Sequence, residues 1–230
     1  MNKVPSVDKT IEMIKSDIPN FEVRFKNRDT LQKIIGWIMF FNRDYMTNYT
    51  TTLYPRVYFP SEASVERVTY YRTLCHEYVH LKDRLDHGVW FSFSYLFPQN
   101  LAILALLSVL SFISLQFLWT LLFLLFLAPL PAYFRTHWEL RGYTSNLYIT
   151  YLVSGKFDSY QVSAIKDIFL SWGYYRMCWS ENKINKHIDL IKKKIEDGTV
   201  EEGKEGHVFK RIGDLHRSSN SNNEGSNETL

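Results

Sequence analysis

The feature that most constrains this chain is a long segment without charged side chains. Between Asp86 and Arg135 the sequence has no Asp, Glu, Lys or Arg, and residues 101–130 are almost entirely apolar. Uncharged apolar runs longer than about 18 residues are typical of membrane insertion. We therefore expect residues 97–134 to be inserted in a lipid bilayer. The alternative is a buried hairpin in a protein that has no membrane contact.

The length of this run favours a hairpin over a single crossing. As one α-helix, its densest thirty or so residues would extend about 45 Å, whereas the hydrocarbon core of a bilayer is about 30 Å thick. Two helices between Pro98 and Phe134 would have about 17 residues, or about 26 Å, each. Such helices need local thinning of the bilayer or partial insertion. The least hydrophobic part, residues 111–116, is the expected turn.

Basic residues flank the apolar run on both sides: Lys82, Arg84, Arg135 and Arg141. By the positive-inside rule, both flanks are expected on the cytoplasmic side of the membrane. Two crossings or a re-entrant hairpin would place them there together, whereas one crossing would separate them. We expect the hairpin, although the sequence alone leaves one and two crossings open.

The remaining composition excludes several classes of protein. The net charge is only +3, from 27 basic and 24 acidic residues, so nucleic-acid binding is not expected. Two cysteines, Cys75 and Cys178, are too few for a disulfide framework or a four-thiolate zinc site. The sequence has no Gly-rich phosphate loop and no G-x-S-x-G nucleophile motif.

Residue patterns predict an α+β unit before the apolar run and helices after it. The first unit has expected helices at 6–18, 30–41 and 61–85, and expected strands at 21–25, 49–53 and 56–59. Asp29 and Ser61 are the expected N-caps of the second and third helices. The later helices are expected at 133–152, 159–169 and 182–197.

Four regions follow from these patterns: an α+β part at 1–96, a membrane hairpin at 97–134, a helical part at 135–197 and a disordered tail at 198–230. The aromatic residues at 172–179 fit either a membrane interface or a core-packing turn. The basic face of the helix at 182–197 fits either anionic lipid or plain solvation.

The segment HEYVH at residues 76–80 has the pattern H-E-x-x-H. Its spacing places His76 and His80 on one helix face, one turn apart, where they can share a zinc ion. Zinc accepts three protein ligands and leaves a fourth position to water, whose pKa it lowers toward neutrality. Glu77 is then placed to act as the general base. Chance gives only about 0.01 such patterns in a chain of this composition, so we predict a zinc site rather than an accidental pair of histidines.

The third zinc ligand is open between two carboxylates. In the metzincin arrangement a ligand follows closely after a glycine that bends the helix, and Asp86 stands at that ligand position. Asp83, however, stands where the glycine would be needed. The other candidate is Glu139, which is the only acid between Asp86 and Asp158.

A helix over residues 133–152 gives Glu139 suitable neighbours. Gly142 and Tyr143 share its helix face, so Gly142 would permit close approach to the HEYVH helix and Tyr143 would offer a phenol to an oxyanion. A structural ion pair of Glu139 with Arg135 or Arg141 is the alternative. We expect Glu139 to be the third ligand.

These segments resemble the gluzincin zinc metallopeptidases, and among them small membrane-associated peptidases of phage and bacterial genomes. The resemblance rests on HEYVH at 76–80, on Asp83 and on ELRGY at 139–143, and it covers about residues 50–150. Gluzincins with an E-x-x-A motif have alanine where this chain has Gly142, and many lack an apolar insertion between the two helices.

The resemblance implies a zincin-like fold with a small sheet and an active-site helix. It implies that His76, His80 and Glu139 bind zinc and that Glu77 is the base. Asp83 lies on the same helix face as both histidines, where it would accept a hydrogen bond from an imidazole N–H; a simple ion pair with Lys82 or Arg84 is the alternative.

The expected function is that of a membrane-associated zinc metallopeptidase that hydrolyses a protein or peptide near the bilayer. Its active site is expected on the cytoplasmic side of the membrane. Strand 56–59 (RVYF) is the expected edge along which an extended substrate pairs. One alternative is a non-enzymatic membrane adaptor or structural protein with a degenerate HExxH helix. Another is a zinc hydrolase that acts on a non-peptide bond. The natural substrate and the oligomeric state cannot be read from the sequence.

Overall fold

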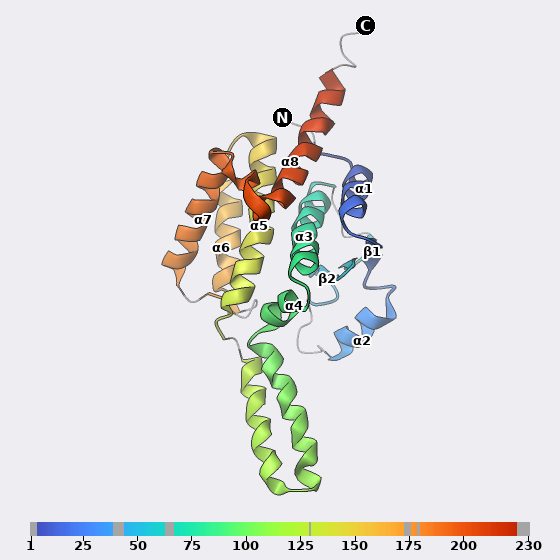
Figure 1. The fold of residues 1–230 in the computed structure, drawn as a ribbon, viewed down its shortest axis with the longest axis vertical. Helices are drawn as coiled ribbons and strands as arrows, with labels where there is room; N and C mark the ends of the chain where they lie inside the picture. Colours follow the sequence, from blue (N-terminus) through green and yellow to red (C-terminus); the bar gives the residue numbers. More distant parts are fainter. Residues whose placement is uncertain are drawn as a thin grey trace.

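The computed structural model describes residues 4–38, 44–62, 67–128, 130–172, 176–178 and 180–224. The protein is mostly helical with one small mixed sheet, which agrees with the expected α+β class. Figure 1 shows a body of helices and strands from which a long hairpin projects at one end.

The predicted elements at the start of the chain are confirmed with small shifts of their ends, except that the expected end of the second helix at 41 lies outside the described residues. They are α1 (Val7–Asp17), β1 (Glu22–Phe25), α2 (Thr30–Ile38), β2 (Thr51–Leu53) and β3 (Arg56–Phe59). Asp29 caps α2 as expected, because its Oδ1 accepts a hydrogen bond from the backbone N–H of Gln32 at 3.0 Å. Ser6 caps α1 in the same way through the N–H of Lys9.

The expectation that residues 56–59 form a sheet edge is wrong. The strand order is β1-β3-β2, with β1 parallel and β2 antiparallel to β3. Val57, Tyr58 and Phe59 are buried, so β3 is the central strand because it has the most apolar side chains to cover. β2 lies at one edge of the described sheet.

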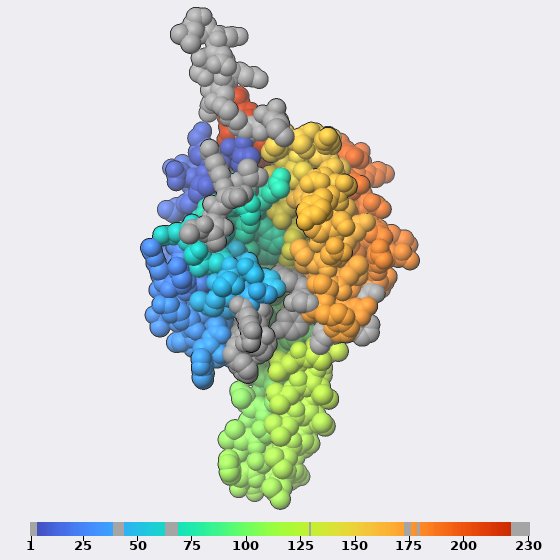
Figure 2. All heavy atoms as spheres, turned by 180° about the vertical axis from the view of Figure 1, so that it is seen from behind, coloured from blue at the N-terminus to red at the C-terminus, as the bar shows by residue number. Residues whose placement is uncertain are grey.

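Two long helices cross the middle of the body. They are α3 (Arg67–His87), which contains HEYVH, and α5 (Tyr133–Ser154), which contains ELRGY. The two helices pack against each other and lie side by side in Figure 1. The expected cap of α3 at Ser61 is not tested, because residues 63–66 lie outside the described part of the chain. In Figure 2, turquoise α3 lies recessed between the blue N-terminal and the orange C-terminal halves.

The apolar run forms α4 and an antiparallel pair of 3₁₀ helices. The elements are α4 (Val89–Leu96), η2 (Gln99–Phe112) and η3 (Leu115–Leu127). The chain reverses at Ile113 and Ser114, within the stretch 111–116 in which a turn is expected. No single described helix is long and apolar enough to cross a membrane. By length and composition α4 and η2 together pass that test, although they are bent by 85°.

The C-terminal part differs from the expected disordered tail. After α6 (Ser159–Leu170) and α7 (Glu181–Glu196), the chain forms η5 (Thr199–Glu201) and α8 (Gly203–Glu224). Val208, Phe209 and Ile212 are buried against the core, and their spacing places them on one face of α8. A short apolar stripe therefore orders a segment whose composition alone indicates disorder. Residues 225–230 lie outside the described part of the chain.

Candidate metal centre

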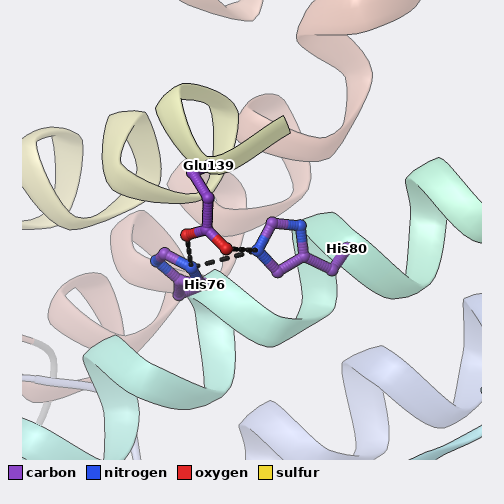
Figure 3. Close-up of side chains that lie close together, drawn as sticks. All are labelled: His76, His80 and Glu139. Atoms are coloured by element: carbon purple, nitrogen blue, oxygen red, sulfur yellow. Dashed lines mark hydrogen bonds and ion pairs between the residues drawn. The ribbon is translucent and has the colours of Figure 1, made fainter. Parts of the chain in front are cut away.

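The helix α3 places the two motif histidines toward α5. His76 and His80 are one turn apart and buried, and their Nε2 atoms lie 3.1 Å from each other (Figure 3). The rings meet edge to face, with 4.8 Å between their centroids. Both rings therefore turn the same nitrogen toward one point, as two ligands of one ion would.

The helix α5 adds Glu139 to this pair. Its Oε2 lies 3.5 Å from Nε2 of His76, and its Oε1 lies 3.9 Å from Nε2 of His80. One ligand atom from each of the three residues lies within 4.8 Å of the others. The alternative ligand, Asp86, instead lies 3.7 Å from Lys82 in an ion pair at the surface of α3. The structure therefore brings Glu139, and not Asp86, to the histidines.

The three side chains fit a metal ion in spacing and in chemistry. Two nitrogens bound to one tetrahedral zinc at about 2.05 Å lie about 3.3 Å apart, close to the 3.1 Å between His76 and His80. Oε2 of Glu139 is buried without a hydrogen-bond partner among the described residues. A buried carboxylate oxygen of this kind needs a cation or a donor. Two imidazoles and a carboxylate can hold a metal ion, and zinc is one that accepts this set.

Burial and mutual contact set the charges of the group. Burial opposes charge on His76, but its contact with Glu139 outweighs this and raises the pKa of His76. Burial lowers the pKa of His80 to about 4. Burial alone would raise the pKa of Glu139, but the two histidines outweigh it and lower that pKa to about 2. Glu139 is therefore ionised and His80 neutral at neutral pH, whereas a proton held by His76 would have to leave before its Nε2 could bind a cation.

Gly142 explains how α3 and α5 approach so closely. A Cβ atom at this position would lie 2.5 Å from Nε2 and 2.6 Å from Cε1 of His76. No other residue therefore fits here without moving the imidazole. The expectation that Gly142 permits close approach of the two helices is confirmed.

Glu77, the expected base, lies beside the metal ligands and is held by the sheet. Oγ1 of Thr52 on β2 donates a hydrogen bond to Oε2 of Glu77 at 2.6 Å. Burial raises the pKa of Glu77. A carboxylate with a raised pKa binds a proton more readily, which is what a general base requires.

Two tyrosines line the group. The ring of Tyr143 meets the ring of His76 edge to face, with 4.7 Å between centroids. Burial raises the pKa of Tyr143, so its phenol keeps its proton at neutral pH and remains a hydrogen-bond donor. Tyr95 on α4 donates its O–H to Oε1 of Glu139. The element that begins the apolar run therefore contacts Glu139, the candidate third ligand, directly.

The expectation that Asp83 accepts a hydrogen bond from an imidazole is wrong. Asp83 pairs with Arg141, whose Nε and Nη2 lie 3.0 Å and 2.9 Å from its Oδ1. Nδ1 of His80 is buried and has no hydrogen-bond partner among the described residues. Asp83 pairs with Arg141 rather than with an imidazole because a guanidinium on the facing helix offers a buried carboxylate two donors and a full charge.

The side chain of Asn146 lies at the outer nitrogen of His76. Its amide nitrogen is 3.5 Å from Nδ1 of His76, and its amide oxygen is buried without a partner among the described residues. The oxygen and nitrogen of a carboxamide exchange places by a half turn. After that turn the oxygen faces Nδ1 and can accept its hydrogen, which leaves Nε2 free for a metal.

The sequence patterns do not mark Thr52 or Tyr95 as members of the site, and they place Asn146 only on the same helix face as Glu139. Thr52 and Tyr95 belong to elements whose patterns predict only a strand and an apolar segment. Contacts between residues tens of positions apart leave no periodic trace in one sequence.

Comparisons with known proteins find no family model, no curated protein and no solved structure that matches this chain. What the protein does must therefore be inferred from the site itself.

Proposed function

We propose that this protein is a membrane-associated zinc metallopeptidase. The observation that carries the proposal is the buried group of His76, His80 and Glu139, with Glu77 directly beside the first ligand. His76 and His80 would hold zinc through Nε2, and Glu139 would hold it through a carboxylate oxygen. Zinc bound there would polarise a peptide carbonyl and acidify a water molecule.

The residues of the chain have separate parts in the reaction. Glu77 accepts the proton of the attacking water and passes it to the leaving amine, while Thr52 holds its carboxylate in place. Tyr143 donates its O–H to the oxyanion that develops on the carbonyl oxygen. Tyr95 orients Glu139 through its hydrogen bond. Burial of these groups limits access of bulk water, which strengthens each charged contact.

The strand beside the site suggests how a peptide binds. Thr52 lies on β2, at the edge of the described sheet, and its neighbour across the pair is Val57 of β3. An extended peptide that paired with β2 would place its backbone beside Glu77. This assignment replaces β3 as the strand for substrate pairing.

The hairpin supports the membrane part of the proposal. η2 has 14 residues, which at the 3₁₀ rise of about 2.0 Å extend about 28 Å and nearly match the hydrocarbon core of about 30 Å. Many large apolar side chains of the two hairpin helices are exposed, among them Leu106 and Phe112 on η2 and Leu122 and Leu125 on η3. Two antiparallel helices return the chain to the same side, as a metal shared by α3 and α5 requires.

The proposal is tested by metal content and hydrolysis together. Full-length protein in detergent should contain about one zinc per chain by elemental analysis, and His76→Ala should lose it. His87→Ala, on the same helix outside the group, is the matched control and should keep zinc. Glu77→Gln should keep zinc but lose cleavage of a synthetic peptide library, followed by mass spectrometry.

Each outcome has a defined meaning. Zinc without cleavage of any peptide in the library would leave the metal centre but contradict peptidase activity, and would favour a hydrolase of another bond. The same metal content in wild type, His76→Ala and a protein-free blank would contradict the metal centre and favour the adaptor. Full cleavage by Glu77→Gln would contradict the role of Glu77 as base.

A further inference from the structure

The helix α2 is folded with its apolar face outward. Leu31, Ile34, Trp37 and Ile38 are between 51% and 80% exposed, whereas the one buried residue of the helix is the polar Gln32. Amphipathic helices of globular proteins normally turn the apolar face toward the core. An inverted helix of this kind needs a partner that covers its apolar face.

Specific contacts hold the inner face of α2 in place. The side-chain oxygen of Gln32 accepts a hydrogen bond from the phenol of Tyr45 at 2.6 Å. Gly36 lies so close to Met46 that a Cβ atom would approach its side chain to 2.8 Å. The helix is thus fixed to the body by its polar face and its glycine. Its apolar residues cannot turn inward without breaking these contacts.

Other exposed apolar residues lie at the same end of the body as α2. Figure 1 shows α2 at the lower end of the body, at the height where the hairpin leaves it. Trp90, Phe93 and Leu96 of α4 are exposed at the root of the hairpin. Trp172, which follows α6, is also exposed. A few residues later, the carbonyl of Met177 accepts a hydrogen bond from the backbone N–H of Ala132 at the hairpin root. This part of the chain therefore lies close to the root. We call α2 and these four exposed side chains the collar.

We propose that α2 lies in the headgroup region of a lipid bilayer as an interfacial helix, with its apolar face toward the acyl chains. Trp37 and the aromatic residues of the collar then occupy the depth at which tryptophan is enriched in membrane proteins. The inference rests on the membrane part of the proposed function, because the hairpin defines the same plane. It does not depend on the metal or on catalysis.

The composition and position of α2 favour lipid over a protein partner. Its nine residues, TLQKIIGWI, contain one charged side chain, Lys33, and no acid. Lys33 is exposed beside the apolar face, where a lysine can extend toward lipid phosphates. The helix α2 also lies at the height of the hairpin root, where a bilayer that holds the hairpin would meet the body (Figure 1). The chain leads from α2 to β2, so this contact would hold the edge strand and Glu77 near the membrane.

The depth of Trp37 can be measured with a nitroxide label. Trp37→Cys and Tyr160→Cys form a matched pair, since both aromatic side chains are 80% exposed. Tyr160 lies in the first turn of α6, and α6 begins at the end of the body away from the hairpin (Figure 1). Both variants carry Cys178→Ser, while Cys75 is fully buried and can remain. A third label at Leu106→Cys reports on insertion of the hairpin itself.

The full chain is reconstituted in vesicles of phosphatidylcholine and phosphatidylglycerol, and relaxation of each label by oxygen and by a water-soluble nickel chelate is compared. The ratio of oxygen to nickel relaxation should be several-fold higher at position 37 than at position 160. Ile34→Cys, on the same face, should repeat the result if Trp37→Cys fails to fold.

Two outcomes would overturn the inference. Equal ratios at positions 37 and 160 would place α2 in water; a lipid-exposed label at 106 would then still support the hairpin. A label at 37 that is shielded from both reagents would mean that protein covers this face. Because no metal or peptide is used, neither outcome bears on the proposed peptidase activity.

Discussion

At the scale of single residues, the candidate metal group of His76, His80 and Glu139 depends on the absence of a side chain at Gly142. The α-carbon of this residue faces the imidazole of His76, and the space that a methyl group would fill is already occupied. A glycine inside a long helix costs about 1 kcal/mol relative to alanine, so its presence here has a packing reason. That reason is the distance between α3 and α5 at the metal ligands.

Gly142→Ala should therefore remove metal binding while the fold is kept. The new methyl group displaces the ring of His76, and we expect zinc affinity to fall at least about tenfold. Overpacking should also lower the free energy of unfolding by about 1–3 kcal/mol. Zinc titration and thermal unfolding measure the two effects. Ser154→Ala at the exposed end of α5 is the control. Wild-type zinc affinity in Gly142→Ala would contradict the assignment of His76 as a ligand.

Asn146 is expected to orient His76 through its outer nitrogen. Asn146→Leu should lower zinc affinity about 10- to 100-fold, as loss of a hydrogen-bond acceptor behind a metal-bound histidine typically does. Asn146→Asp keeps an acceptor and should retain most of the affinity. Competition with a zinc chelator distinguishes the variants. If both variants bind zinc equally, Asn146 has no such role.

At the scale of elements, a buried ion pair joins α3 to α5 next to the metal group. The side chains of Asp83 and Arg141 are 2% and 13% exposed, and their nearest atoms lie 2.9 Å apart. Burial raises the pKa of Asp83 to about 6, while Arg141 opposes this shift. The pair is therefore charged at pH 7.5 and fixes the register of the two helices that carry the ligands.

Removing one member of this pair should be costly. Asp83→Asn leaves the buried guanidinium of Arg141 with the exposed Glu205, 3.2 Å away, as its remaining carboxylate partner among the described residues, and we expect a loss of about 1–3 kcal/mol of unfolding free energy at pH 7.5. Lys82→Ala breaks the exposed pair with Asp86 on the same helix and should cost less than about 1 kcal/mol. Denaturant unfolding in detergent compares the two. Equal losses would show that the buried pair has no special part in joining the helices.

At the scale of the whole molecule, α8 closes the body over α1, α3 and α5. Arg211 on α8 lies 3.2 Å from Asp17 of α1 in an ion pair that spans the length of the chain. The same helix buries His216, which is 2% exposed. Burial lowers the pKa of His216 below its ordinary value of 6.5.

His216 should make folding stability depend on pH in the acidic range. Between its lowered folded pKa and 6.5, the unfolded chain binds more protons at this residue than the folded chain does. Unfolding free energy should therefore fall as pH drops below about 6.5, by at most about 1.4 kcal/mol per pH unit from this residue. His216→Gln should flatten the profile, whereas His207→Gln, at an exposed position on α8, should not. Identical profiles for wild type and His216→Gln would contradict this assignment.

The sequence by itself determined the elements whose signal is local. The helix that carries HEYVH, the helix that carries ELRGY and the break near residue 113 depend on patterns that repeat every few residues. Backbone geometry turns such patterns directly into helix faces and ends. The pairing of His76 and His80 is also of this kind, because one helical turn suffices to align them.

Only the tertiary structure decided which distant groups meet. It brought Glu139 rather than Asp86 to the histidines and gave Asp83 the partner Arg141. It also placed β3 at the centre of the sheet, ordered α8 and turned the apolar face of α2 outward. These outcomes depend on which surfaces pack together after the elements have formed. That choice is made by the summed burial and charge pairing of many residues, and no local period in the sequence encodes it.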